Sequence, residues 1–518
     1  MWDDARTIGG DLGTLFVLLA GLMAGSSIVA VVFGEWYAIP ALLLSAALTG
    51  GLGALLTRWG SDAPDTDPAH GLVTAALAWL FSGVLCSLPI LFVAWTVALD
   101  PRWLATPELN RTLAVFLSPV DAVFEGTSGV TGTGLTMSLD EAQHPATIQW
   151  WRSLIQWIGG IGVVVLAAAI VLTGESGSFR QLYEEKAAVE EIGSSTRETM
   201  RAIWWVFVAV TVIAIVALWL AGMPAWHAIN HGMTGISTGG FTVVDDSIAA
   251  YDSPLIEAVL LPIMALGAIS FAVHYYVLKG SVRALYEDRQ TRWLFVLFAV
   301  GALLVSMFLF GGPFETRGEA IRFGVFQFVS ALSCTGFQTD GALGTLWSGE
   351  AMLMLVAGMT IGGASGSTAG GIKVIRLISL MKGSYYRITQ AFFNDVDRTP
   401  DVASEEGEAT VDQSSSEFDQ AAAVGLLWIL LLLVGVVGLL VVLGEPLETV
   451  LFEVASAQGN VGISAGLTGH GMPDAAKGIL MLNMWIGRLE IIPVAALARV
   501  LIKGFGTDIE SEGEDGND

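Results

Sequence analysis

Residues 225–241 read AWHAINHGMTGISTGGF, a short segment of mixed polarity between two long apolar blocks. Its first part, Ala225–Gly235, is much shorter than the roughly 20 residues that a helix needs to cross a bilayer. The glycine-containing loop Ser237-Thr238-Gly239-Gly240-Phe241 follows at once. Irregular backbone at membrane depth is tolerated only where it is buried in protein or lines a watery cavity. The stretch therefore predicts a re-entrant helix followed by a loop inside a membrane protein.

The same pattern occurs three more times along the chain. The other short segments are Pro119–Ser128, Ala320–Leu332 and Leu447–Gln458. The loops after them are Thr131-Gly132-Thr133-Gly134-Leu135, Ser333-Cys334-Thr335-Gly336-Phe337 and Gly459-Asn460-Val461-Gly462-Ile463. The copies recur at intervals of roughly 100 residues, which indicates an internal repeat of whole subdomains.

Long apolar blocks without Asp, Glu, Lys or Arg surround these segments. The 518 residues are 53% hydrophobic and 14% charged, whereas soluble domains are about 25% charged. The blocks predict about ten membrane crossings, including two before Arg58 that stand outside the repeat. A signal peptide is not expected, because Asp3 and Asp4 stand where one would be positively charged. The fold class is an all-α polytopic membrane protein: four pseudo-symmetric helix–pore-loop–helix repeats around one pore, plus an N-terminal helical pair.

The predicted organisation follows from these blocks. It comprises an N-terminal transmembrane helix pair (1–60), repeat 1 (70–180), repeat 2 (200–285), repeat 3 (290–390), an acidic cytoplasmic linker (391–419), repeat 4 (420–505) and an acidic disordered tail (506–518). Lys and Arg gather in alternate loops, for example at Arg180, Lys186, Arg197 and Arg201. By the positive-inside rule these loops are cytoplasmic, and so are both termini.

The charge balance is strongly acidic, with a formal net charge of −25. The acid lies mostly in the linker and the tail. It fits either a well-solvated surface or a halophilic prokaryotic host, which we favour, and it argues against nucleic-acid binding. The two cysteines, Cys86 and Cys334, exclude a disulfide framework and have no metal-like spacing.

The four loops have the composition of an ion filter. Glycine permits backbone conformations that direct carbonyl oxygens to a common axis, and such oxygens replace the hydration shell of potassium. We expect Gly134, Gly239, Gly336 and Gly462 to be equivalent, with Thr133, Thr238 and Thr335 before three of them. The predicted ion-binding residues are Thr131, Gly132, Thr133, Gly134, Ile236, Ser237, Thr238, Gly239, Ser333, Cys334, Thr335, Gly336, Gly459, Asn460, Val461 and Gly462. The alternative is that the small residues serve close helix packing.

Two polar features interrupt the returning helices. Gly358–Gly371 contains too many glycines and serines for a stable helix, so it predicts either a close-packing face or a mobile loop that obstructs the pore. Lys373, which follows it, either faces the aqueous cavity or extends to the cytoplasmic interface. Arg488 and Glu490 are intramembrane charges two residues apart, so they lie on different helix faces and are not expected to pair with each other.

The loops and the polar features described above resemble those of the Trk/Ktr/HKT superfamily of potassium transporters, and in particular the membrane subunit of the prokaryotic Trk system. The motifs are Phe124–Gly129, Ile236–Phe241, Ile361–Arg376 and Gly487–Glu490. The resemblance implies a pseudo-fourfold pore in a homodimer, potassium preference from the loop glycines, and a role for Arg488 in tuning permeation; a buried structural ion pair is the alternative for Arg488. It also implies a gate in the glycine-rich segment. The gate residues would be Gly362, Gly363, Ser365, Gly366, Ser367, Gly370, Gly371 and Lys373.

The same resemblance implies a partner and a location. A cytoplasmic regulatory ring with Rossmann-type domains would bind nucleotide, this chain would need no cofactor, and potassium would be the substrate in a cell membrane. Gly132, Cys334 and Asn460 depart from the usual loop pattern, which leaves discrimination against rubidium or sodium open.

Other functions and sites have weaker support in the sequence. A symporter that couples the cation to protons or sodium is the main alternative, since such proteins also have repeats with broken helices. An enzyme is not predicted, because no nucleophile–base set or metal cluster is present. His227 and His231 share one helix face but lack further metal ligands. Glu125 either contacts backbone behind its loop, the structural role that we favour, or adds negative potential there. Asp245, Asp246 and Asp340 fit solvated outer loops or a cation-attracting mouth.

Overall fold

The computed structural model describes residues 2–64, 66–100, 107–173, 196–341, 343–392 and 411–505. Regular structure in these ranges is helical, apart from an isolated bridge between Phe310 and Phe314. The predicted all-α fold class is confirmed. The tail 506–518, linker residues 393–410 and the basic residues Arg180 and Lys186 lie outside the described part of the chain.

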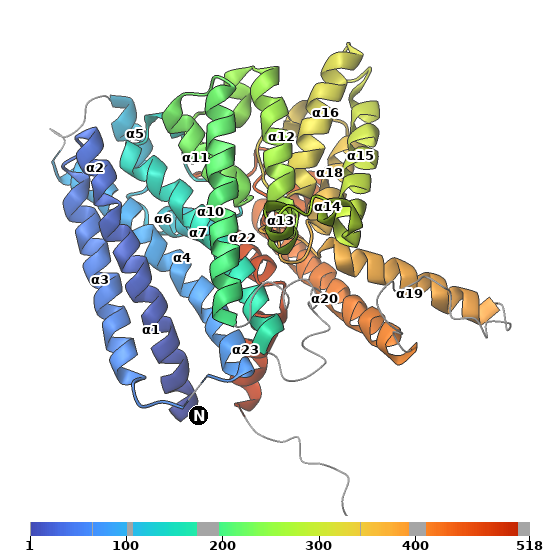
Figure 1. Ribbon diagram of the computed structural model, residues 1–518. Coiled ribbons are helices and arrows are strands. Elements are labelled where there is room, and N and C mark those ends of the chain that lie inside the picture. Colours follow the sequence, from blue (N-terminus) through green and yellow to red (C-terminus); the bar gives the residue numbers. More distant parts are fainter. Residues whose placement is uncertain are drawn as a thin grey trace, which may run out of the picture.

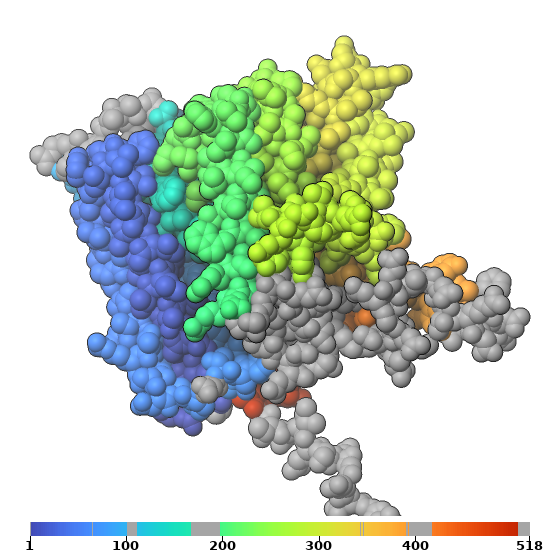
Figure 2. Space-filling view, viewed as in Figure 1, coloured from blue at the N-terminus to red at the C-terminus, as the bar shows by residue number. Residues whose placement is uncertain are grey.

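The N-terminal helices stand beside the repeats. They are α1 (Trp2–Gly25), α2 (Ser27–Phe33) and α3 (Ala38–Trp59). Helices α1 and α3 approach closely because glycines face each other: a Cβ on Gly13 would lie 2.6 Å from the carbonyl oxygen of Gly53. Small residues allow this kind of backbone contact between membrane helices. The pair covers one flank of the molecule, seen in dark blue in Figure 2.

Each repeat contains a long helix, a short pore helix and a returning helix (Figure 1). The long helices are α4 (Pro68–Leu99), α10 (Thr196–Leu220), α15 (Arg289–Leu309) and α20 (Val411–Leu443). The pore helices are α6 (Pro119–Thr131), α11 (Ala225–Ile236), α16 (Arg317–Leu332) and α21 (Leu447–Gln458). They match the predicted re-entrant segments within three residues at either end. Short helices α5 (Pro107–Val115), α14 (Ala284–Glu287) and α17 (Leu343–Leu346) connect these elements.

The returning helix is continuous in the first repeat and broken in the other three. It is α7 (Ala146–Thr173), then α12 (Pro254–Ala268) with α13 (Phe271–Leu278), α18 (Gly349–Ile361) with α19 (Val374–Phe392), and α22 (Asp474–Arg488) with α23 (Ile492–Lys503). The α12–α13 pair bends by 109°. Between α22 and α23 the break contains left-handed residues, Glu490 at φ 52° and Ile491 at φ 72°. The sequence predicted the break after α18 but not the sharp bend at Ile269.

The surface and the interior have the polarity of a membrane protein. Six described helices are long and apolar enough to cross a bilayer, and the bent α12–α13 pair would make seven. The remaining crossings expected from the sequence would be α7 and the broken pairs of repeats 3 and 4. Large apolar side chains such as Leu426, Val434 and Val441 are exposed along α20. Polar side chains in the second half of the pore helices are buried, by contrast, as Glu125 and Glu453 are.

The two described ends of the chain lie on the same side. His70 begins α4 beside the N-terminal helix, with its Nε2 atom 3.2 Å from Oδ1 of Asp4. The His70 ring also stacks on Phe505, with ring centroids 4.7 Å apart. This placement agrees with the even number of crossings expected from the sequence.

Candidate functional site

The four loops after the pore helices share one backbone conformation. Each contains two left-handed residues separated by one other residue, and the second of them is always glycine. The φ pairs are Gly132 67° and Gly134 92°, Thr238 50° and Gly240 75°, Cys334 56° and Gly336 87°, and Asn460 53° and Gly462 92°. Left-handed backbone favours glycine, which explains why the second of these residues is glycine in every loop.

Backbone hydrogen bonds give the same alignment. The N–H groups of Thr133, Thr335 and Val461 donate to the carbonyls of Ser128, Ser330 and Ser456 at 2.9, 3.0 and 2.9 Å. In the second loop the equivalent donor is Gly239, which bonds to the carbonyl of Thr234 at 2.8 Å.

The expected equivalence of Gly239 with Gly134 is therefore wrong by one residue. Gly240 is the equivalent glycine, and Gly239 takes the place of Thr133. The sequence Thr238-Gly239-Gly240 offers two adjacent glycines, and only the backbone angles decide between them. Gly240, which follows the predicted set Ile236–Gly239, was missed as a ring residue for this reason.

The loops contact one another in a closed ring. A Cβ on Gly134 would lie less than 3.0 Å from the carbonyl oxygen of Gly239, and a Cβ on Gly240 would do so at Thr335. The same close approach of a glycine to a carbonyl of the next loop joins the third loop to the fourth and the fourth back to the first. Those pairs are Gly336 with the carbonyl of Val461, and Gly462 with the carbonyl of Thr133. Four loops from distant parts of the chain thus converge on one axis.

Side-chain hydroxyls follow a twofold pattern in this ring. Thr131 and Thr133 have their Oγ1 atoms 2.8 Å apart, and in the opposite loop Ser333 Oγ lies 2.8 Å from Thr335 Oγ1. Gly239 and Val461 have no hydroxyl at the equivalent place. Asn460 also ties the fourth loop to the first, because its Nδ2 donates to Thr133 Oγ1 at 3.0 Å.

Buried carboxylates hold the outer ends of two loops. Glu125 accepts from Thr136 Oγ1 at 2.9 Å and from the Met137 amide at 2.9 Å, and it forms an ion pair with Arg152 at 2.7 Å. Glu453 makes the matching contacts in the fourth loop, with Ser464 Oγ and the amides of Ala465 and Thr468. Glu125 therefore has the structural role expected of it, while Glu453 was not singled out from the sequence.

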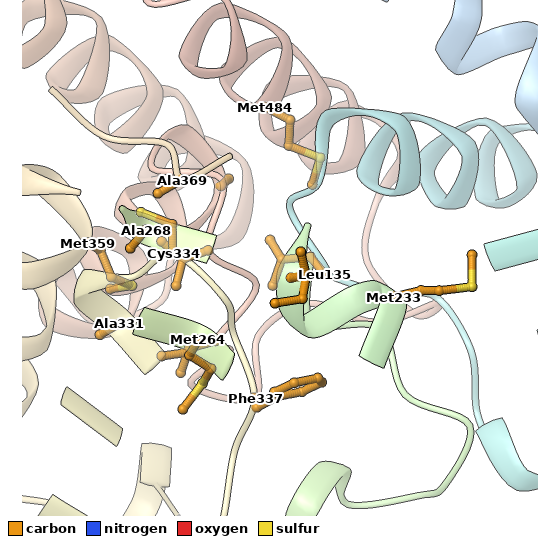
Figure 3. Close-up of a cluster of buried hydrophobic side chains, with 14 of the residues drawn as sticks. Leu135, Met233, Met264, Ala268, Ala331, Cys334, Phe337, Met359, Ala369 and Met484 are labelled. Atoms are coloured by element: carbon orange, nitrogen blue, oxygen red, sulfur yellow. The ribbon is translucent and has the colours of Figure 1, made fainter. Parts of the chain in front are cut away.

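The glycine-rich segment Gly362–Lys373 lies against the inner side of the ring. Thr368 Oγ1 donates to the carbonyls of Ile236 and Gly267, each at 2.9 Å. A Cβ on Gly370 would lie less than 3.0 Å from the Gly459 carbonyl. Figure 3 shows Ala369 of this segment beside Cys334 of the third loop. The segment thus connects the second and fourth loops and leaves no room for side chains at Gly370.

Four charged residues are buried beneath the ring. Arg488 donates from Nη1 to the Thr368 carbonyl and from Nη2 to the Gly159 carbonyl, both at 2.8 Å. Glu490 pairs with Arg376 at 2.7 Å and lies 3.6 Å from Lys373 Nζ. Arg488 and Glu490 thus have different partners, as predicted. Lys373 is buried and donates to the Ala369 carbonyl at 2.5 Å, so it does not extend to the interface.

The remaining candidates have structural contacts. His227 Nδ1 bonds to Tyr251 Oη at 2.8 Å and His231 Nδ1 to the His227 carbonyl at 2.8 Å. No group of three His, Cys, Asp or Glu side chains in the described ranges could hold a metal ion. Asp245 accepts from the Ala142 amide at 3.0 Å and Asp340 from Trp347 Nε1 at 2.7 Å.

The helix repeats and the loop ring define a membrane protein of the ion-transporting class, and comparisons with known proteins agree. The TrkH family model, described as "Cation transport protein", matches residues 96–504. The chain therefore belongs to the TrkH family of cation transport proteins.

Individual relatives cover most of the chain. An uncharacterized cation transporter of Methanocaldococcus jannaschii is 30% identical over 83% of this chain and 82% of its own length. The Trk system potassium uptake protein TrkH of Halomonas elongata is 30% identical over 94% of this chain and 96% of its own length. The crystal structure of the potassium transporter TrkH from Vibrio parahaemolyticus superposes with a TM-score of 0.80 at 25% identity, covering 95% of this chain and 98% of that one.

Proposed function

We propose that this protein takes up potassium by conducting the ion through the ring of four loops. The observation that carries the proposal is the closed set of glycine–carbonyl contacts, which assembles main-chain oxygens from all four repeats around one axis. Rings of backbone carbonyls replace the hydration shell of potassium in selective pores. The names of the relatives from Halomonas elongata and Vibrio parahaemolyticus, both potassium transporters, support the choice of ion.

The segment Gly362–Lys373 is our proposed gate. It lies on the inner side of the ring, and the cationic groups of Lys373 and Arg488 bond to its own carbonyls. Two buried positive charges on the inner side oppose the passage of a cation while the segment stays in place. Movement of the segment would open the pore, as other mobile loops do on a microsecond to millisecond timescale.

A regulator and an assembly complete the proposal. We propose a homodimer in the cell membrane of a halophilic prokaryote, with a cytoplasmic nucleotide-binding regulatory subunit. Helix α19 starts directly after Lys373 and extends away from the body of the molecule (Figure 1). A partner that displaces α19 would therefore pull on the gate segment.

Ion flux into liposomes tests the proposal. The full-length protein is reconstituted, and uptake of potassium, rubidium, sodium and lithium is compared in the same vesicles. We expect potassium and rubidium to enter faster than sodium and lithium, down their own gradients. Reversal potentials that shift with a proton or sodium gradient would instead support coupled symport, and equal uptake of all four ions would contradict the filter.

A further inference from the structure

Helix α7 of the first repeat places Gln156 directly behind the second loop. The side chain is fully buried. Its Nε2 donates to the Gly239 carbonyl oxygen at 2.5 Å, and its Oε1 accepts from the Phe241 amide at 3.0 Å. One side chain of repeat 1 thus holds the loop of repeat 2 on both sides of Gly240. Within the described part of the chain, no side chain donates to the equivalent carbonyls of Thr133, Thr335 or Val461.

Gln156 occupies the space that a side chain at position 239 would need. Gly239 is the only one of the four equivalent residues without a side chain. Its backbone is not in the left-handed region, so its conformation does not require glycine. A Cβ on Gly239 would, however, lie 2.5 Å from both Cδ and Oε1 of Gln156. The side chain of Gln156 therefore fills the space that is left free because Gly239 has no side chain.

The returning helices of repeats 2 and 4 have a different residue at this place. Gly159, Gly267 and Gly487 mark equivalent positions, because a Cβ on each would lie less than 3.0 Å from the carbonyl at the C-terminal end of its own pore helix. The residues three positions earlier are Gln156, Met264 and Met484. Both methionines are fully buried, and Figure 3 draws them beside the loops.

We propose that Gln156 is a positioning residue that sets the ion selectivity of the ring. The inference rests on the proposed conduction of potassium through the four loops. Gly239 stands where the other loops have Thr133, Thr335 and Val461, so this position has more backbone freedom than its equivalents, because glycine has the largest conformational entropy to lose. The two hydrogen bonds from Gln156 remove that freedom. Without them, the Gly239 carbonyl would follow a smaller ion inward, and the ring would discriminate less against sodium.

The first test replaces Gln156 in the full-length protein and measures reversal potentials with potassium on one side of the membrane and sodium on the other. Gln156→Met removes both hydrogen bonds and installs the residue of repeats 2 and 4. We expect potassium flux to continue while the potassium-to-sodium permeability ratio falls roughly three- to tenfold, the effect of losing the one hydrogen bond that holds the Gly239 carbonyl. Gln156→Glu keeps the acceptor for Phe241 but loses the donor to Gly239, so the ratio should fall as well. The control Met307→Leu, at an exposed position on α15, should keep the wild-type ratio.

A double substitution separates positioning from general damage. Gly239→Thr alone should abolish flux, because its side chain meets Gln156. Gly239→Thr together with Gln156→Met gives the second loop the threonine of the first and third loops, and gives α7 the methionine of repeats 2 and 4. This double variant should recover both flux and selectivity. A wild-type permeability ratio in Gln156→Met, or a double variant as inactive as Gly239→Thr, would overturn the inference. Absence of potassium flux in the wild-type protein would instead contradict the proposed function.

Discussion

At the scale of single residues, the four ring glycines carry two separate constraints. Each has a φ angle in the left-handed region, between 75° and 92°. Each also lies so close to a carbonyl of the next loop that a Cβ would collide with backbone, which cannot move aside as a flexible side chain can. A side chain at these positions therefore strains its own loop and displaces the neighbouring one.

Substitution of the ring glycines should alter selectivity. We expect Gly134→Ser and Gly240→Ser to lower the potassium-to-sodium permeability ratio by about tenfold or more, since left-handed backbone and a displaced carbonyl cost of order 1–3 kcal/mol. Reversal potentials under bi-ionic conditions measure this ratio. Gly21→Ser in α1, where a Cβ meets nothing within 4 Å, is the matched control. If Gly240→Ser left the ratio unchanged, the corrected alignment of the second loop would be wrong.

The Glu125–Arg152 pair is a buried charge pair behind the first loop. Arg152→Met should lower the free energy of unfolding by about 3–5 kcal/mol, because it leaves Glu125 buried without its cation. Thermal denaturation in detergent measures the loss. Adding Glu125→Gln should restore part of it. Arg387→Met, which removes an exposed pair with Asp419, should change stability by only about 0–1 kcal/mol. Equal losses in the two single variants would contradict this role of burial.

At the scale of elements, the returning helices differ in how they support the ring that we propose as the pore. Helix α7 is continuous, its Gln156 donates to the Gly239 carbonyl, and its Gly159 packs closely against the Val130 carbonyl near the end of α6. The returning helix of the third repeat instead opens into Gly362–Lys373, whose Thr368 holds the second repeat through two hydrogen bonds. A gate needs a fixed support and a segment whose hydrogen bonds can break. Helix α7 fits the first requirement, and the segment Gly362–Lys373 fits the second.

Weakening the proposed gate should raise basal flux. Thr368→Val removes the hydroxyl whose one proton is shared between the Ile236 and Gly267 carbonyls. We expect rubidium flux in liposomes to rise about three- to tenfold, because a hydrogen bond stabilises the closed segment by roughly 0.5–1.5 kcal/mol. Deletion within Gly363–Gly370 should raise it further. Thr360→Val is the control, since that hydroxyl bonds only within its own helix, to Val356. Unchanged flux in both gate variants would show that the segment does not obstruct the pore.

At the scale of the whole molecule, the hydropathy pattern was enough to predict the repeats. The long uncharged blocks predict the membrane crossings. Segments such as Ala225–Gly235 are too short to span the membrane, so their length alone predicts a re-entrant path. The glycine run after α18 predicted a helix break for the same local reason. The pore-helix positions and the convergence of the loops were therefore accessible before any coordinates.

Contacts between repeats were not accessible from the sequence. The bond from Gln156 to Gly239 joins residues 83 positions apart, and Asn460 reaches Thr133 across 327 positions. Hydropathy and spacing describe one segment at a time, so they cannot show which loop a buried side chain meets. For the same reason the pair Gly239-Gly240 was aligned one residue too early, because the contact with Thr335 decides which glycine belongs to the ring.

The central claim is that the four loops bind a dehydrated monovalent cation between their carbonyl oxygens. Crystals of the protein grown in thallium or rubidium, measured at the absorption edge of the ion, test it most directly. We predict anomalous density on the axis of the ring, surrounded by the carbonyls of Thr133, Gly239, Thr335 and Val461. Crystals that diffract well but show no anomalous density within that ring would contradict the account.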